Sequence, residues 1–311
     1  MKVLLTDQVF PDIEVERQML AKAGHTLVVA STADEARKYL PEADAVLTTF
    51  APFPAGVLDT MTNTKIIARY GIGVDNIDVE AASARGIIVT NVPDYCVEEV
   101  ASHSVAMALS LHRHLSQADA AARAGEWGVA AVRPIHRIST LTVGLLGYGK
   151  IGRLVATTMA TFGCQILIYD PYVRDLPDTV LSVDLDELFS RADVLFLHAP
   201  LTAETRGLVN KDRIAQLPQG AIVVNAARGP LIVLDDLIDA LRSGHLGGAA
   251  LDTFPLEPLD PNLVVDVPNL LLSPHTAYYS EEAIAESQKK ATTQIIKVLA
   301  GNKADYEVNR R

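Results

Sequence analysis

The sequence is poor in cysteine, in positive charge and in long apolar runs. Its two cysteines, Cys96 and Cys164, lack the spacing of a metal site, and we expect both to be reduced packing residues. A formal net charge of −11 argues against nucleic acid or an anionic membrane as the main partner. No apolar run has transmembrane length, and the first residues predict a strand rather than a signal peptide. We therefore expect a cytoplasmic protein with no metal site.

The composition is that of a folded protein with a sizeable core. Hydrophobic residues make up 49% of the 311 residues and charged residues 21%, which makes extensive disorder improbable on compositional grounds. The length favours about two domains. An anionic substrate remains compatible with the negative net charge, because a local arginine can reverse the field inside one site.

A glycine-rich turn in the middle of the chain is the most informative motif. Residues 141–146 form an apolar run of strand length, residues 147–152 read GYGKIG, and an apolar-periodic helix pattern follows. Asp170 follows the next predicted strand, residues 165–169, 18 positions after Gly152. A strand, GxGxxG, a helix and a later acid together match the dinucleotide-binding fingerprint, whereas the glycines alone would be weak evidence.

Each part of the fingerprint has a physical role. Gly147 permits the tight turn, Gly149 lets the backbone approach a pyrophosphate, and Gly152 lets the helix pack close to the strand. The helix N-terminus then offers N–H groups to the phosphates. Asp170 would accept hydrogen bonds from the ribose hydroxyls and repel a 2′-phosphate, which favours NAD over NADP. The alternative, purely structural explanation is a glycine turn in an α/β sheet that binds no nucleotide.

Strand and helix patterns alternate on both sides of this motif, which predicts an α/β protein with two Rossmann- or flavodoxin-like domains, parallel sheets and a cleft between them. Residues 94–124 predict one long helix, and residues 280–299 a final helix that returns to the first domain. We expect a discontinuous substrate domain (1–97 plus 284–311) and an NAD-binding domain (98–283). The alanine-rich long helix suggests burial against a second subunit, hence a homodimer.

Three predicted strand ends in the second half carry reactive residues. Arg228 follows one strand, Asp252 ends another with Glu257 five residues later, and His275 follows the last. Taken singly, each has an ordinary explanation: a surface ion pair, a helix cap or a loop residue. Together they supply an anion-binding cation, a general acid/base and a carboxylate to tune it, at the strand ends where parallel sheets bind ligands.

These residues lie in segments that resemble one known family. The chain is similar to the D-isomer-specific 2-hydroxyacid dehydrogenases along essentially its whole length. The branch it looks closest to contains the C-terminal-binding proteins, which are transcriptional corepressors, and their bacterial enzyme relatives. The matching segments, in order, are RYGIGVDNID, GLLGYGKIG with YDPY, HAPLTAETRGLVN, VVNAARGPLI, GAALDTFPLEP and SPHTAYYSEEA.

The resemblance implies a catalytic set. Arg228 would bind the carboxylate of a 2-oxo acid and polarise its carbonyl, and His275 would be the general acid in reduction and the base in oxidation. Glu257 would hydrogen-bond His275, fix its tautomer and favour the imidazolium. The similar formate dehydrogenases have Gln in place of Glu257, which argues against formate as substrate.

The resemblance also implies binding residues. On the substrate side these are Arg69, Gly71, Ile72, Gly73, Arg228 and Tyr278, the last standing where many members have Trp. The implied cofactor-binding residues are Gly147, Tyr148, Gly149, Lys150, Ile151, Gly152, Asp170, Pro171, His198, Ala199, Pro200, Thr205, Ala226, Ala227, Asp252 and His275.

We therefore expect an NAD-dependent dehydrogenase that interconverts a small 2-oxo acid and its D-2-hydroxy acid. Two alternatives stay open. One is an NAD(H)-sensing binding protein like the corepressors, which keep the same catalytic residues. The other is oxidation of an inorganic anion such as phosphite, an activity of similar folds.

Overall fold

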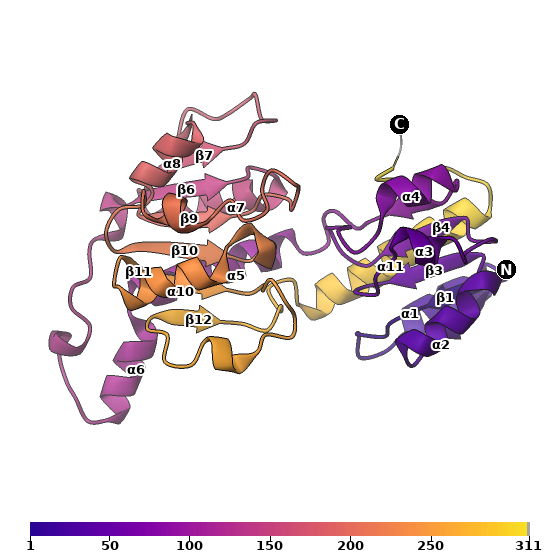
Figure 1. Cartoon of the computed structure of the whole chain (residues 1–311), viewed down its shortest axis with the longest axis horizontal. Helices are drawn as coiled ribbons and strands as arrows, with labels where there is room; N and C mark the ends of the chain where they lie inside the picture. Colours follow the sequence, from indigo (N-terminus) through magenta and orange to yellow (C-terminus); the bar gives the residue numbers. More distant parts are fainter. Residues whose placement is uncertain (310–311) are drawn as a thin grey trace. The chain divides into compact units, whose positions relative to one another are not determined.

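A computed structural model describes residues 1–309 and divides the chain into two compact units (Figure 1). Unit 1 comprises Met1–Tyr95 and the C-terminal segment from Ser280, and unit 2 comprises Cys96–Tyr279. Both units are α/β structures in which every strand pair within the sheets is parallel. The predicted fold class of two Rossmann-like parallel sheets is confirmed.

Unit 1 is built on a five-stranded sheet of order β2-β1-β3-β4-β5. The order reverses between β1 and β3, which makes that pair the topological switch point where parallel sheets commonly bind ligands. Its strands are β1 (Lys2–Leu5), β2 (Thr26–Val29), β3 (Ala45–Thr48), β4 (Ile66–Arg69) and β5 (Ile88–Thr90), and its helices are α1 (Glu14–Lys22), α2 (Ala33–Tyr39), α3 (Ala55–Leu58), α4 (Val79–Ala84) and α11 (Glu281–Leu299).

Unit 2 is built on a seven-stranded sheet of order β12-β11-β10-β9-β6-β7-β8. The order reverses between β6 and β9, and the fingerprint follows β6 directly. The strands are β6 (Thr142–Leu146), β7 (Gln165–Tyr169), β8 (Val180–Ser182), β9 (Val194–Leu197), β10 (Ala221–Asn225), β11 (Leu246–Leu251) and β12 (Leu270–Leu272). The α-helices are α5 (Val97–His112), α6 (Leu115–Arg123), α7 (Lys150–Ala160), α8 (Leu185–Arg191), α9 (Lys211–Ile214) and α10 (Leu234–Arg242).

The strands are apolar along their length because both faces of each sheet are covered. In unit 2, one face of the sheet packs against α8 and α10 and the other against α5 and α7. The central strands β9 and β10 are buried at every position. These two cores hold the carboxyl ends of the strands in fixed register, which is what positions the loops that follow them.

The predicted single helix over residues 94–124 is wrong. The structure has two helices, because α5 ends at His112 and α6 begins at Leu115 after His114, whose φ of 53° is left-handed. Seven residues of α5 are buried, whereas α6 buries none, so the chain breaks where it leaves the core of unit 2.

The segment around α6 stands away from the rest of unit 2 as an arm, which we define as residues 115–137 (Figure 1). Within residues 1–309, no helix is both long and apolar enough to cross a membrane. Short elements that the sequence did not predict include α4 and the edge strand β8.

Candidate active site

The fingerprint turn is shaped by contacts that leave no room for side chains at two glycines. Gly147 has a φ of 98°, and a Cβ there would lie 2.6 Å from the backbone of His198 and Ala199. A Cβ on Gly152 would lie 2.4 Å from the carbonyl oxygen of Gly147. The first contact brings the end of β9 against the turn, and the second brings α7 against it.

Gly149, by contrast, faces open space, since a Cβ built there would meet nothing within 4 Å. It is the N-cap of α7 and has no side chain that could cap the first N–H groups of the helix. An uncapped helix N-terminus beside an unobstructed backbone suits a pyrophosphate. The residues present therefore fit a dinucleotide.

Asp170 is held in place by the fingerprint itself. Its Oδ2 accepts a hydrogen bond from the Tyr148 N–H at 2.8 Å, and its Oδ1 accepts one from the Tyr172 N–H at 2.9 Å. Tyr148 is buried, with the Arg153 guanidinium 4.5 Å from the centre of its ring. The carboxylate thus lies within one hydrogen bond of the glycine turn, and its orientation is set before any ligand arrives.

The loop after β9 carries the remaining predicted cofactor residues of that region. Burial of the imidazole lowers the pKa of His198 to about 4, so this histidine is neutral near pH 7. Its Nε2 is buried and has no hydrogen-bond partner among the described residues. The Thr205 hydroxyl donates to the Pro200 carbonyl at 2.7 Å and accepts from the Thr202 N–H, which closes a compact turn.

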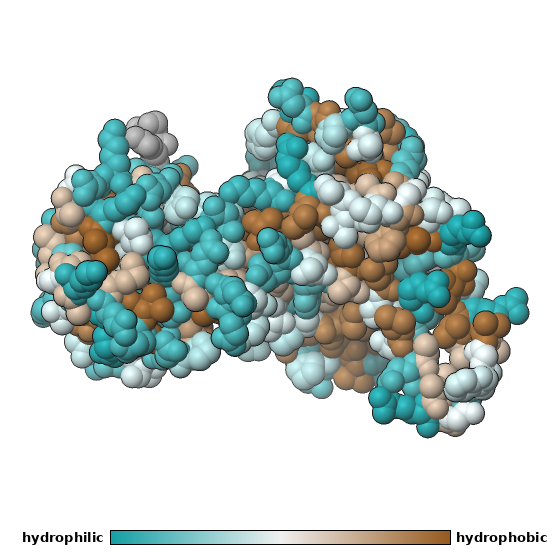
Figure 2. Space-filling view, turned by 180° about the vertical axis from the view of Figure 1, so that it is seen from behind, coloured by the Kyte–Doolittle hydropathy of each residue, from teal (hydrophilic) through white to brown (hydrophobic). Residues whose placement is uncertain are grey.

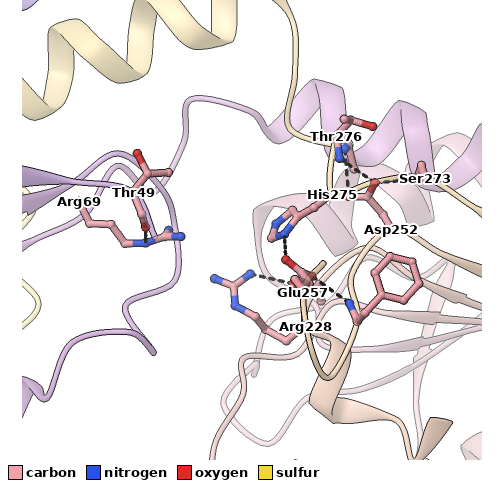
Figure 3. Close-up of polar contacts among 11 residues, drawn as sticks. Thr49, Arg69, Arg228, Asp252, Glu257, Ser273, His275 and Thr276 are labelled. Carbon is pink, nitrogen blue, oxygen red and sulfur yellow. Dashed lines mark hydrogen bonds and ion pairs between the residues drawn. The ribbon is translucent and has the colours of Figure 1, made fainter. Parts of the chain in front are cut away.

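Arg228 is presented by a turn that Asn225 organises. The buried Asn225 amide donates to the Arg228 carbonyl at 2.9 Å and accepts from the Ala227 N–H at 3.1 Å. The next residue must be glycine, because a Cβ on Gly229 would lie 1.9 Å from the backbone of Phe254. This close approach brings the Arg228 turn against the loop that carries Glu257 (Figure 3).

His275 and Glu257 form a hydrogen-bonded pair. His275 Nδ1 lies 2.7 Å from Glu257 Oε2, and the other carboxylate oxygen accepts the Phe254 N–H at 2.9 Å (Figure 3). Burial alone would raise the pKa of Glu257, but the hydrogen bonds from His275 and Phe254, with the charges of His275 and Arg228, lower it below its usual value. Glu257 is therefore a carboxylate at neutral pH.

The charge state of Glu257 settles the tautomer of His275. A carboxylate only accepts hydrogen bonds, so Nδ1 of the imidazole must carry the hydrogen that points at Glu257. The second ring nitrogen, Nε2, is then the atom that gains or loses a proton. His275 can act as an acid or a base through Nε2 alone.

The backbone at His275 is strained, and Asp252 holds it. His275 has a φ of 55°, which is uncommon outside glycine and asparagine. The buried Asp252 carboxylate accepts hydrogen bonds from the N–H groups of the next two residues, Thr276 at 2.8 Å and Ala277 at 3.0 Å. Its carbonyl accepts the His275 N–H at 2.9 Å. Asp252 was predicted to bind the cofactor; its observed contacts fix the loop that presents His275.

Two further residues extend this network. Ser273 donates its hydroxyl hydrogen to Asp252 Oδ1 at 2.6 Å, and His103 Nε2 lies 2.9 Å from the same hydroxyl oxygen. Because the serine hydrogen is used on Asp252, the Ser273 oxygen must accept from His103 Nε2–H. His103 of α5 thereby links that helix to the His275 loop.

On the substrate side, the predicted residues lie at the carboxyl end of β4 in unit 1. Arg69 Nε donates to the Thr49 carbonyl at 3.1 Å (Figure 3), and its guanidinium lies over the next loop, where a Cβ on Gly71 would be 1.9 Å from it. The carbonyls of Gly71 and Ile72 accept hydrogen bonds from the Val92 N–H and the Asn91 amide. In unit 2, the Tyr278 ring packs edge-on against His275, with centroids 6.0 Å apart.

Comparison with known proteins identifies the family. Residues 105–277 match the model of the NAD binding domain of the D-isomer specific 2-hydroxyacid dehydrogenases. The chain belongs to this family. Unit 2 is its NAD-binding domain, and NAD is the cofactor.

Several members of the family are similar over most of this chain. D-3-phosphoglycerate dehydrogenase of Mycobacterium leprae is 39% identical over 87% of this chain and 52% of its own length. Glyoxylate reductase of Thermofilum pendens is 35% identical over 82% of this chain and 78% of its own. The crystal structure of D-lactate dehydrogenase from Aquifex aeolicus, complexed with NAD and lactic acid, has a TM-score of 0.91 at 25% identity, with 100% of both chains covered.

The chain spans about half the length of the first of these curated relatives. The relatives also differ in the substrates that their names state. The resemblance to the corepressor branch stays a prediction, because these matches define the family and not the branch.

Proposed function

We propose that this protein is an NAD(H)-dependent dehydrogenase that interconverts a small 2-oxo acid and its D-2-hydroxy acid. The observation that carries the proposal is the 2.7 Å contact between His275 Nδ1 and Glu257 Oε2, beside Arg228, in an NAD-binding domain of this family. An imidazole oriented by a carboxylate is well suited to proton transfer to a carbonyl oxygen.

His275, Glu257 and the cofactor would have separate roles in the reduction. The glycine turn at residues 147–152 and Asp170 would hold the dinucleotide, and NADH bound there would supply the hydride for the carbonyl carbon. His275 protonates the carbonyl oxygen from Nε2, while Glu257 holds Nδ1–H and stabilises the imidazolium from which that proton comes. In the direction of oxidation, the neutral imidazole takes the hydroxyl proton at the same atom.

Arg228 serves as the anchor of the substrate carboxylate. Its turn is fixed by Asn225 and Gly229, and its guanidinium has planar donors that match a carboxylate. Its charge also contributes to the lowered pKa of Glu257. One cation therefore helps to keep Glu257 a carboxylate and attracts the anionic substrate.

We also propose that the working unit is a homodimer assembled through the arm. Trp127 is 94% exposed and Val129 69% exposed, and neither α6 nor the adjacent turn at residues 129–131 buries any residue. Figure 2 shows brown, apolar side chains among teal, polar ones on the face of unit 2 seen in that view. Both cysteines are buried and neither forms a disulfide within the described residues, which suits the reducing cytoplasm proposed as the protein's compartment.

A screen for NADH oxidation tests the function. We expect turnover with at least one of glyoxylate, hydroxypyruvate, pyruvate, phenylpyruvate or a longer 2-oxo acid, and a D-2-hydroxy acid as product. Tight NADH binding without turnover of any of them would contradict the proposal and favour an NAD(H) sensor. NAD reduction by phosphite in place of 2-hydroxy acids would favour oxidation of an inorganic anion.

A further inference from the structure

The loops at the carboxyl edge of the unit 1 sheet are strongly unbalanced in charge. The segments that follow the five strands, residues 6–13, 30–32, 49–54, 70–78 and 91–96, contain no lysine, arginine or histidine in the described chain. Their charged residues are all acidic: Asp7, Asp12, Asp75, Asp78 and Asp94. The basic residue among the strand ends and these segments is Arg69, the last residue of β4, and Lys290 of α11 reaches the edge in an ion pair with Asp94 at 2.7 Å. A substrate that meets the strand ends of unit 1 therefore meets one arginine among loops that are otherwise acidic or uncharged.

At this edge, the backbone N–H groups that could bind an anion already bind a carboxylate of the chain. At the switch point between β1 and β3, the N–H groups of Thr49, Phe50 and Ala51 point together, as in the backbone nests that bind phosphate. The Asp7 carboxylate accepts all three and also a hydrogen bond from the Thr48 hydroxyl at 3.1 Å. A phosphate would have to displace a built-in carboxylate.

The same loop presents an apolar surface. Asp7 fixes the backbone at residues 49–51, and the Asn76 amide donates to the Ala51 carbonyl at 2.8 Å. On this fixed loop, the Phe50 side chain is 46% exposed, next to the Thr49 carbonyl that holds Arg69. An exposed aromatic ring on a rigid loop, adjacent to Arg69, suits a ligand with an anionic end and an apolar body.

We propose that the substrate is a 2-oxo acid with a single carboxylate and an uncharged, apolar side chain that packs against Phe50, and that phosphorylated 2-oxo acids are poor substrates. This inference rests on the proposed dehydrogenase function and narrows its substrate class. It separates this protein from the relatives whose names specify phosphoglycerate.

The test compares kcat/KM with NADH for 4-methyl-2-oxopentanoate, glyoxylate and the phosphate ester of hydroxypyruvate. We expect the apolar acid to exceed the phosphate ester by at least about tenfold, the scale of discrimination by a hydrophobic contact. Equal or better use of the phosphate ester would overturn the inference while leaving the dehydrogenase function intact. Failure of all three, glyoxylate included, would instead contradict the function and the inference with it.

Variants of Phe50 sharpen the test. Phe50→Ala should lower the ratio of kcat/KM for 4-methyl-2-oxopentanoate over glyoxylate by about tenfold, because glyoxylate has no side chain to contact the ring. Phe50→Arg should raise kcat/KM for the phosphate ester. Tyr39→Ala, which removes another exposed aromatic ring at the far end of α2, is the matched control and should keep the ratio of the unaltered protein. A ratio unchanged by Phe50→Ala would contradict the contact.

Discussion

Glu257 shows how one carboxylate can set both the tautomer and the charge of a catalytic histidine. Replacement by Gln keeps an oxygen that can accept the Nδ1–H of His275 but removes the negative charge that stabilises the imidazolium. We expect Glu257→Gln to lower kcat for reduction by about tenfold or more. We also expect the alkaline fall of the reduction rate to begin at a lower pH.

The pH profile of kcat, measured with NADH and the best 2-oxo acid, checks this expectation. A uniform loss of rate at every pH would mean that Glu257 supports the loop and does not tune His275. The same profile for Glu80→Gln, at an exposed glutamate of α4 in unit 1, serves as the control.

Asp170 is the residue from which we infer the choice between NAD and NADP. Its two hydrogen bonds to backbone N–H groups fix a negative charge beside the glycine turn, where it would repel a 2′-phosphate. Asp170→Ala should reduce the ratio of kcat/KM for NADH over NADPH by at least about tenfold. An unchanged ratio would place the preference for NAD elsewhere in the chain.

A site residue can be predicted from the sequence when its role depends on the chemistry of its own side chain. Arg228 and His275 follow strand ends and Glu257 lies in the loop after β11, and the structure pairs His275 with Glu257 as the resemblance implied. The supporting residues Asn225, Ser273 and His103 were missed, because a polar residue at the end of a strand or on a helix has many ordinary uses. Only the three-dimensional contact between His103 and Ser273, 170 positions apart, reveals their link.

At the scale of elements, a buried carboxyl group joins three parts of unit 1. Glu16 of α1 accepts hydrogen bonds from the Tyr70 hydroxyl at 2.8 Å, just after β4, and from the Gln288 amide of α11 at 3.1 Å. Burial raises the pKa of Glu16, although both hydrogen bonds act in the opposite direction. Tyr70 lies between Arg69 and Gly71, so this network supports the loop proposed to face the substrate.

The direction of the pKa shift fixes the effect of pH on stability. The unfolded chain loses the Glu16 proton near its ordinary pKa, whereas the folded protein keeps it to a higher pH. The contribution of Glu16 is therefore fully present below the unfolded pKa and is lost as pH rises through the folded pKa. We expect Glu16→Gln to reduce the loss of unfolding free energy over this interval.

Urea unfolding of both proteins across pH 4 to 8 measures the effect. Glu80→Gln, at an exposed glutamate of α4, is the matched control and should follow the unaltered protein. If Glu16→Gln shows the same pH dependence as the unaltered protein, Glu16 is not the group that couples pH to stability.

The break between α5 and α6 could not be predicted from the sequence pattern. No glycine or proline separates residues 94 and 124, so helical propensity gave no reason to stop. The left-handed residue His114 ends α5 where burial ends, which is a tertiary effect that local propensity does not encode. By contrast, parallel strands such as β9 and β10 were predictable because burial on both faces demands unbroken apolar runs.

At the scale of the whole molecule, the exposed arm at residues 115–137 leads us to predict how two copies of the chain assemble. If two copies pair through it, the exposed Trp127 becomes buried, and a charge there would be costly. We expect the unaltered protein to be a dimer in analytical ultracentrifugation and Trp127→Glu to raise the dimer dissociation constant at least about tenfold. Tyr39→Glu, an exposed aromatic of unit 1, should leave it unchanged. A monomeric unaltered protein, or a variant that dimerises equally well, would contradict this assembly.

We propose above all that this NAD-binding domain performs 2-oxo acid reduction through the Nε2 proton of His275. The most direct test is kcat of His275→Ala with NADH and the best 2-oxo acid, alongside NADH affinity from fluorescence titration. Because NADH binding reports an intact fold, a loss of kcat can be assigned to the chemistry. We expect kcat to fall at least about 10²-fold while the NADH dissociation constant changes little. A variant that reduces the 2-oxo acid at the original rate would contradict the claim.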